Sequence, residues 1–263
     1  MKKVFFLLAI VAVVFASCGK DKVNNLDEKL MGKWMIEVID GQPALTNDKI
    51  VTTFVSPTKA LISSSFVNLP EGVWGTGWHN QNEWNMAIDG DKATLTCQPE
   101  DEVELKAVIT VKNISETEVT EDFQYTATQE GVVVSQREST GVFKKVTDDF
   151  SQAIVGKWQG RCTSGQSLFD DGQEHQWEYF ADGSYVYYSK DENDQWVAAE
   201  AQTQYFVDGT LLFTRWQNTG ERENREWWVI TSIENDVMNW TALRQDDNGN
   251  TFTVTFSMTK VSD

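Results

Sequence analysis

The side chains able to perform acid–base or metal chemistry are few in this sequence. It contains two histidines, His79 and His175, in different halves of the chain. Histidine is the usual general base and metal ligand near neutral pH, but neither has a partner at the spacing of a metal site. The sequence also lacks Gly-x-Ser-x-Gly, His-Glu-x-x-His and phosphate-binding glycine motifs. We therefore interpret both histidines as loop or strand-edge residues, and we expect no catalytic residue, no bound metal and no cofactor.

Oxygen ligands are abundant, because the chain has 40 Asp and Glu residues. Some carboxylates must then lie about 5–9 Å apart by chance, so their number does not identify a glycosidase pair. The run DDNGN, Asp246–Asn250, alternates oxygen-bearing side chains as calcium loops do. Asn-Gly between two strand-like runs is instead typical of a tight hairpin turn, and the glutamate that closes a calcium loop is missing. We predict a turn here.

Tryptophan is in excess, with eleven residues. Most lie in runs where they would pack in a core. Trp74 and Trp78 lie instead in the glycine-containing stretch GVWGTGWHNQNEW, and Trp196 lies in the polar stretch KDENDQWVAAEAQ. Rings on loops at one end of a β fold can stack on a sugar or close over an apolar ligand. They can equally fold back to plug the end of the fold, and the sequence leaves both interpretations open.

Each half of the chain contains eight short runs rich in aromatic and β-branched residues, separated by turn residues. Gly-Lys-Trp at 32–34 opens the first half and returns at 156–158. The hairpins AIDGDKATL and FVDGTLLF, and then the endings FKKV and MTKV, occupy equivalent places in the two halves. Such an ordered series predicts an internal duplication, with domains at 31–147 and 154–263 and a boundary near 147–153.

The fold class predicted from these runs is all-β. Eight short strands joined mainly by hairpins must hide their edges, and closure into an antiparallel up-and-down barrel does so. We therefore predict two tandem eight-stranded barrels, with a β-sandwich as the alternative. Strand alternation turns Cys97 and Cys162 each into the interior of its own barrel, so we expect two buried free thiols and no disulfide between them.

Gly-x-Trp on the first strand and the hairpin FADGSY at Phe180–Tyr185 resemble the lipocalin-like, calycin-type domains of Bacteroidetes lipoproteins. The resemblance implies that Trp34 and Trp158 plug the closed ends of the two barrels, each beneath a basic side chain from a late strand. In TFTVTFSMTKV, alternation places Lys260 at the end of the inward row, and the aligned endings give Lys145 the same role. The alternative is an outward lysine on a frayed strand end.

The first residues have the form of a secretory signal: a basic start, an apolar run at 4–14 and small residues before a cut site. Phe15-Ala16-Ser17-Cys18 resembles the bacterial lipobox. That resemblance implies a signal peptide at 1–17, lipid on Cys18, a tether at 18–30 and anchorage in the outer membrane, facing either the surface or the periplasm. An ordinary secreted protein is the alternative.

The mature chain would be strongly acidic, because loss of residues 1–17 takes the net charge from −18 to −20. This charge repels nucleic acid. The leading functional hypothesis is a non-enzymatic, lipid-anchored protein that binds a small apolar or carbohydrate ligand through loops at a barrel mouth. The second is a structural envelope component with a protein partner and no small ligand. The third, an enzyme, rests only on the abundance of carboxylates.

Overall fold

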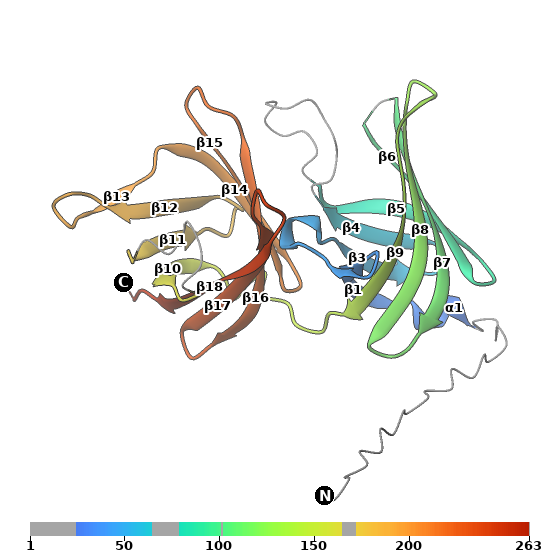
Figure 1. Cartoon of the computed structure of the whole chain (residues 1–263), viewed down its shortest axis with the longest axis horizontal. Helices are drawn as coiled ribbons and strands as arrows, with labels where there is room; N and C mark the ends of the chain where they lie inside the picture. The colour runs from blue at the N-terminus through green and yellow to red at the C-terminus, as the bar shows by residue number, and fades with distance from the viewer. Residues whose placement is uncertain (1–24, 65–78, 101, 165–171, 263) are drawn as a thin grey trace, which may run out of the picture.

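The computed structural model describes residues 25–64, 79–100, 102–164 and 172–262. Nearly all of its regular structure is antiparallel β, arranged as two sheets that follow one another along the chain (Figure 1). The prediction of an all-β fold with two tandem barrel-type domains is confirmed. Within the described ranges, no helix has both the length and the apolar character needed to cross a membrane.

The first sheet is a closed eight-stranded barrel. Each strand pairs with the next, and β9 pairs back onto β1, so the barrel leaves no open edge. The eight runs expected from the sequence are β1 and β3 to β9, while β2 is a short addition to β1. The strands are β1 (Gly32–Ile39), β2 (Gln42–Pro43), β3 (Val51–Ser56), β4 (Lys59–Ser64), β5 (His79–Asp89), β6 (Lys92–Glu100), β7 (Val103–Ile114), β8 (Glu118–Gln129) and β9 (Val132–Lys145).

Alternation and tight turns explain why these residues form hairpins. In β7, Leu105 and Ile109 are buried inside the barrel, while Lys106 faces solvent, as the two-residue period of a strand requires. The turn from β8 to β9 is Glu130-Gly131, with φ of 50° and 77°. Two consecutive positive φ angles define the hairpin turn whose twist matches that of the strands, and glycine adopts the second at little cost.

The second sheet has nine strands and is curled but open. Its order is β13-β12-β11-β10-β18-β17-β16-β15-β14, so β13 and β14 form its two ends. The strands are β10 (Gly156–Cys162), β11 (His175–Tyr179), β12 (Tyr185–Lys190), β13 (Trp196–Ala198), β14 (Ala201–Asp208), β15 (Leu211–Asn218), β16 (Asn224–Glu234), β17 (Val237–Gln245) and β18 (Thr251–Lys260).

The eight strands predicted for this half are present, but their closure into a complete barrel is not. A few bonds join the facing strands instead of a ladder: the Tyr205 amide donates to the Gly183 carbonyl at 2.7 Å, and the Tyr185 amide donates to Thr203 Oγ1 at 3.2 Å. Tyr185 and Tyr205 are both buried at this seam. Both rings pack with Tyr179, whose centroid lies 5.7 Å from that of Tyr185 and 4.8 Å from that of Tyr205.

The two domains share a third hydrophobic core. It forms where the outer face of the first barrel packs on the outer face of β14, β15 and β16, a contact that we did not predict from the sequence. Strand alternation turns its residues away from both barrel interiors, so burial depends on the other domain. The buried members are Met35, Val51, Phe206, Leu211, Phe213 and Trp227.

A buried carboxylate lies beside this core. Asp208 is fully buried and accepts hydrogen bonds from Lys33 Nζ and from Ser63 Oγ, each at 2.5 Å. Lys33 also lies 3.5 Å from Asp149 in the segment between the domains. A buried charge is tolerated when it is paired and hydrogen-bonded, so this cluster ties the second domain to β1 and β4 of the first.

A short turn of the first domain, η1 (Thr46–Asp48), fills a split in the second sheet. The ladder between β16 and β17 ends at Val229 and Thr241, and beyond that point each strand pairs only with its other neighbour. The freed Leu243 amide donates to Thr46 Oγ1 at 2.7 Å. This side chain replaces a lost sheet partner, which explains how a turn from one domain fits inside the sheet of the other.

Candidate functional site

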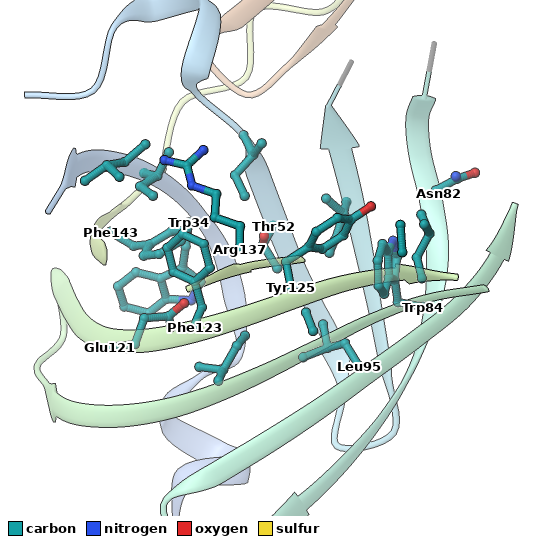
Figure 2. A pocket seen from close by; sticks show the side chains of 18 of the residues that line it. Trp34, Thr52, Asn82, Trp84, Leu95, Glu121, Phe123, Tyr125, Arg137 and Phe143 are labelled. Carbon is teal, nitrogen blue, oxygen red and sulfur yellow. The ribbon is translucent and has the colours of Figure 1, made fainter. Parts of the chain in front are cut away.

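The first barrel encloses a cavity of about 470 Å³, within the range of small-molecule sites. Its lining comes from all eight barrel strands and is mostly aliphatic and aromatic (Figure 2). Trp34 lies at its floor, beside the end of β9, and the β8–β9 turn lies at the opposite end of that strand pair. A chamber with this apolar lining suits a ligand whose apolar surface is buried on binding.

The composition of β9 contributes to the open interior of this barrel. Moving back from Phe143, the inward row reads Gly141, Ser139, Arg137 and Ser135; the glycine and the two serines add little volume, and Arg137 lies at the mouth. Gly141 is a tight position: a Cβ there would lie 2.8 Å from Cε2 of Phe143. The missing side chain therefore gives the Phe143 ring its place at the floor.

The second domain shows the opposite composition. Its last strand, β18, turns Val254, Phe256 and Met258 inward, all of them buried. Around them the ring centroids of Trp177 and Trp240 are 5.2 Å apart, and those of Trp177 and Phe256 are 5.5 Å apart. Aromatic rings thus pack closely among the described residues of this interior, whereas the cavity of about 470 Å³ lies in the first domain.

Glu121 is the notable polar residue at the floor of the cavity. It is 4% exposed, and no described residue hydrogen-bonds or ion-pairs with its carboxyl. Burial, with a smaller effect from Asp122, raises its pKa from the usual 4.5 to about 8. The carboxyl is therefore largely protonated at neutral pH and presents one O–H donor and an acceptor oxygen to the cavity.

Trp84 contributes a second polar atom to the lining. The side chain is 5% exposed, and its Nε1–H is buried without a hydrogen-bond partner. In Figure 2 it lies with Asn82 at one end of the pocket, while Glu121 lies with Phe123 at the other. Buried donors are normally satisfied, so an unpaired indole N–H in a cavity wall marks a position where a ligand acceptor or a water molecule fits.

Charged groups are confined to the mouth. Asp48 and Arg137 both line the cavity there, and Arg137 Nε donates to Ser139 Oγ at 3.1 Å. Burial raises the pKa of Asp48, and the nearby Arg137 opposes the rise. Tyr125 stands between mouth and floor, with its pKa raised mainly by burial. The mouth is thus polar and of mixed charge, and the interior below it is apolar.

Two of the three predicted ligand-binding tryptophans, Trp74 and Trp78, lie outside the described residues, as does Cys18. The third, Trp196, is not in a loop as predicted but begins the edge strand β13, where Lys190 Nζ lies 5.3 Å from its ring centroid. The KDENDQW stretch forms a hairpin that pairs Trp196 with Lys190. Trp196 thus belongs to the second domain and does not line the cavity.

Both predicted lysine–tryptophan contacts are present at the closed ends. Lys145 Nζ lies 4.9 Å from the centroid of Trp34, and Lys260 Nζ lies 5.2 Å from that of Trp158. Each indole N–H also donates at 2.7 Å to a carbonyl four residues earlier, in the segment that crosses the barrel end. In the first domain this segment contains α1 (Leu26–Lys29). The structural role that we assigned to these four side chains stays a prediction.

The glycine of each Gly-Lys-Trp triple now has a physical reason. Gly32 and Gly156 have φ of +111° and +127°. A Cβ at Gly32 would lie 3.1 Å from Cε of Lys145, and one at Gly156 would lie 2.9 Å from Cε of Lys260. The absence of a side chain lets each lysine lie over its tryptophan.

The remaining candidates from the sequence divide into one correction and two agreements. His175 is not at a strand edge: it is 8% exposed inside the second domain, and its Nδ1 lies 2.8 Å from the Tyr187 hydroxyl. Cys97 and Cys162 are buried free thiols, as predicted. Asp246 caps a turn, accepting from the Asn250 amide at 2.8 Å, also as predicted. The described residues contain no group of three or more His, Cys, Asp or Glu placed to hold a metal ion.

Comparisons with known proteins give only distant likenesses. No protein-family model matches the sequence, and no curated protein matches it. Among solved structures, the chain is similar to a double mutant of the vaccine antigen Transferrin Binding Protein B from Haemophilus parasuis Hp5, with 10% identity, a TM-score of 0.25, and coverage of 82% of this chain and 54% of that chain. It is also similar to intact Ap-TbpB with its N and C lobes, with 11% identity, a TM-score of 0.22, and coverage of 81% and 55%. The chain spans about half the length of these structures.

Proposed function

We propose that this chain is a non-enzymatic, lipid-anchored envelope lipoprotein whose first barrel binds a small, mainly apolar ligand. The observation that supports this is the cavity of about 470 Å³, lined by aliphatic and aromatic side chains. The lipobox-like residues before Cys18 support lipid attachment, a tether at 18–30 and location in the outer membrane. The Gly-Lys-Trp strands support kinship with the lipocalin-like domains of Bacteroidetes lipoproteins.

The lining favours an apolar ligand over a carbohydrate. Sugars are bound through many hydrogen bonds, and each hydroxyl buried without a partner is costly. Aliphatic and aromatic surfaces such as Ile36, Phe54, Leu95 and Leu105 dominate the chamber instead. Burial of apolar ligand surface contributes about 25 cal/mol of binding free energy per Å², so the cavity favours ligands rich in hydrocarbon.

A structural role is the second candidate, and the second domain favours it. Its interior is filled by aromatic rings, and its outer face is fixed to the first barrel by the third core and by Asp208. Such a domain suits the presentation of a surface to an envelope protein partner. This role is compatible with ligand binding by the first domain, and a binding experiment distinguishes the two hypotheses.

Binding is tested with the mature chain and a neutral fluorescent apolar probe such as N-phenyl-1-naphthylamine. Trp34 and Trp84 line the cavity, so their fluorescence provides a second signal. Ala127→Phe places a ring in the chamber, because Ala127 is buried in its lining. Ala198→Phe, at an exposed position on β13, is the matched control.

We expect saturable probe binding by the parent chain and the control, and at least a tenfold loss in Ala127→Phe, equivalent to about 1.4 kcal/mol. Absence of binding by a folded parent chain would refute the ligand hypothesis and leave the structural one. Lipid attachment is tested separately by fatty-acid labelling in cells, which Cys18→Ser is expected to abolish. Continued labelling of that variant would place the lipid elsewhere.

A further inference from the structure

The polar atoms inside the cavity limit the chemistry of its ligand. Glu121 lies in the inward row of β8 with Val119, Phe123, Tyr125 and Ala127, all of which line the same chamber. Its ladder partners are Val111 on β7 and Gly141 on β9. Neither neighbour carries a polar side chain, so a carboxyl at this position has no structural partner and faces the space that a ligand would occupy.

The charge state of Glu121 follows from its neighbours. Asp122 is the charged residue next to it on β8; it points to the outside of the barrel, paired with Lys112 at 2.5 Å. Asp48 and Arg137 are at the mouth. Among the described residues, no cation lies close enough to offset the burial, which raises the pKa of Glu121 to about 8. At neutral pH the group is therefore mostly a carboxylic acid, able both to donate and to accept.

A second unpaired polar atom supports the same conclusion. The Nε1–H of Trp84 is a donor only, and it is buried in the lining without a partner. A ligand oxygen can accept from it. Because Trp84 and Glu121 lie at opposite ends of the pocket (Figure 2), each would need an oxygen atom of its own on the ligand, or a water molecule at Trp84.

We infer that the ligand is an apolar molecule carrying a neutral oxygen group, a hydroxyl or a carbonyl, that hydrogen-bonds with Glu121 at the cavity floor. This inference rests on the proposed function and deepens it by naming the ligand class. A carboxylate end group would bring a charge into an apolar site where burial, by raising its pKa, already keeps Glu121 neutral, and burying a charge without a compensating cation is costly. An ammonium end group would ionise Glu121 and bury an ion pair, with the desolvation penalty of both charges.

Three ligands with one common chain test this inference: 1-decanol, decanoate and decylamine, each used below its aggregation concentration at pH 7. Each displaces the neutral fluorescent probe from the mature chain. We expect decanol to bind about tenfold tighter than either charged ligand, the difference expected when one hydrogen bond is made and a buried charge is avoided. Glu121→Gln keeps a donor and an acceptor, and we expect it to keep this order.

Glu121→Leu supplies the decisive comparison, because it keeps the volume and removes both polar functions. We expect it to bind the neutral probe at least as well as the parent chain, but to bind decanol at least about threefold more weakly, because the ligand hydroxyl loses its hydrogen-bond partner. Circular dichroism checks that each variant is folded. If Glu121→Leu does not fold, Glu121→Gln and the parent chain still decide.

The contrary results are distinct. Tighter binding of decanoate or decylamine than of decanol by the parent chain would overturn the inference, as would an unchanged affinity for decanol in a folded Glu121→Leu. Either result leaves the proposed function standing, because ligands still bind. Failure of the parent chain to bind the probe and all three ligands would overturn the proposed function, and the inference with it.

Discussion

Replacing Glu121 by glutamine is expected to change how the stability of the protein depends on pH. The folded protein holds the Glu121 proton up to a pKa of about 8, whereas the usual value, expected in the unfolded chain, is 4.5. Folding therefore favours the protonated form. The stabilisation is fully present below pH 4.5, falls as the pH rises through the interval up to about 8, and is constant above it.

The magnitude follows from the difference between the two pKa values. They differ by about 3.5, and each unit corresponds to about 1.4 kcal/mol, so the upper limit is about 5 kcal/mol. Water in the cavity would solvate the ionised carboxylate and reduce the effect. We expect a loss of about 2–5 kcal/mol between pH 4.5 and pH 9 that is specific to this carboxyl.

The assay is urea unfolding of the parent chain and of Glu121→Gln at several pH values between 4.5 and 9. Other titrating groups are common to both proteins, so the difference in unfolding free energy isolates Glu121. Glu104→Gln, at an exposed position on β7, is the control for loss of a carboxylate as such. The reasoning fails if Glu121→Gln is not more stable than the parent chain at pH 9, or if its advantage does not grow as the pH rises.

Three further predictions concern the packing that shapes the molecule. Gly156→Ala should lower the free energy of unfolding in urea by about 1–3 kcal/mol, because φ is +127° and the new Cβ would contact Lys260. The control is Gly220→Ala, where φ is also positive but the Cβ would meet open space, and it should lose less stability. Equal losses would contradict the close contact at Gly156. Lys260→Met should cost about 0.5–1 kcal/mol by removing the cation above its tryptophan ring, and no loss would indicate a purely steric role. Asp208→Ala should lower the free energy of unfolding by about 3–5 kcal/mol, because Lys33 loses its buried partner. Calorimetry of this variant should then resolve two thermal transitions where the parent chain shows one. A single unshifted transition would show that the ion pair does not couple the domains.

Local patterns were sufficient to predict the strands and closed ends from sequence. Residues such as Leu105 and Lys106 alternate because one face of each strand meets the interior, and Gly-Lys-Trp with its late lysine is a short-range signature. The same alternation could have identified Glu121, since TEVTEDFQYTA places one acid in an inward row that otherwise consists of Val119, Phe123, Tyr125 and Ala127. That signal was present in the sequence but was obscured by the abundance of carboxylates.

Contacts between the domains could not be predicted in this way. Met35 and Val51 point out of a barrel, and nothing local distinguishes a covered outer face from an exposed one. The burial of His175 is a similar case, because it depends on rings from distant strands such as Phe256, whose centroid lies 5.9 Å away. Whether a barrel interior is open or filled also depends on the total side-chain volume that all its strands contribute. A small side chain on β9 creates space only because side chains on neighbouring strands do not fill it.

The cavity and the interface between the domains share one short segment. Thr46 and Asn47 of η1 bind the second sheet, Thr46 through the Leu243 amide and Asn47 through the Arg244 guanidinium. Asp48, the next residue, lines the mouth of the cavity. Arg244 also donates to the carbonyl of Trp227 at 3.0 Å, on the strand from which its own strand has separated. The second domain therefore fixes the backbone on which one side of the mouth is built, and a displacement of either domain must move that side of the entrance.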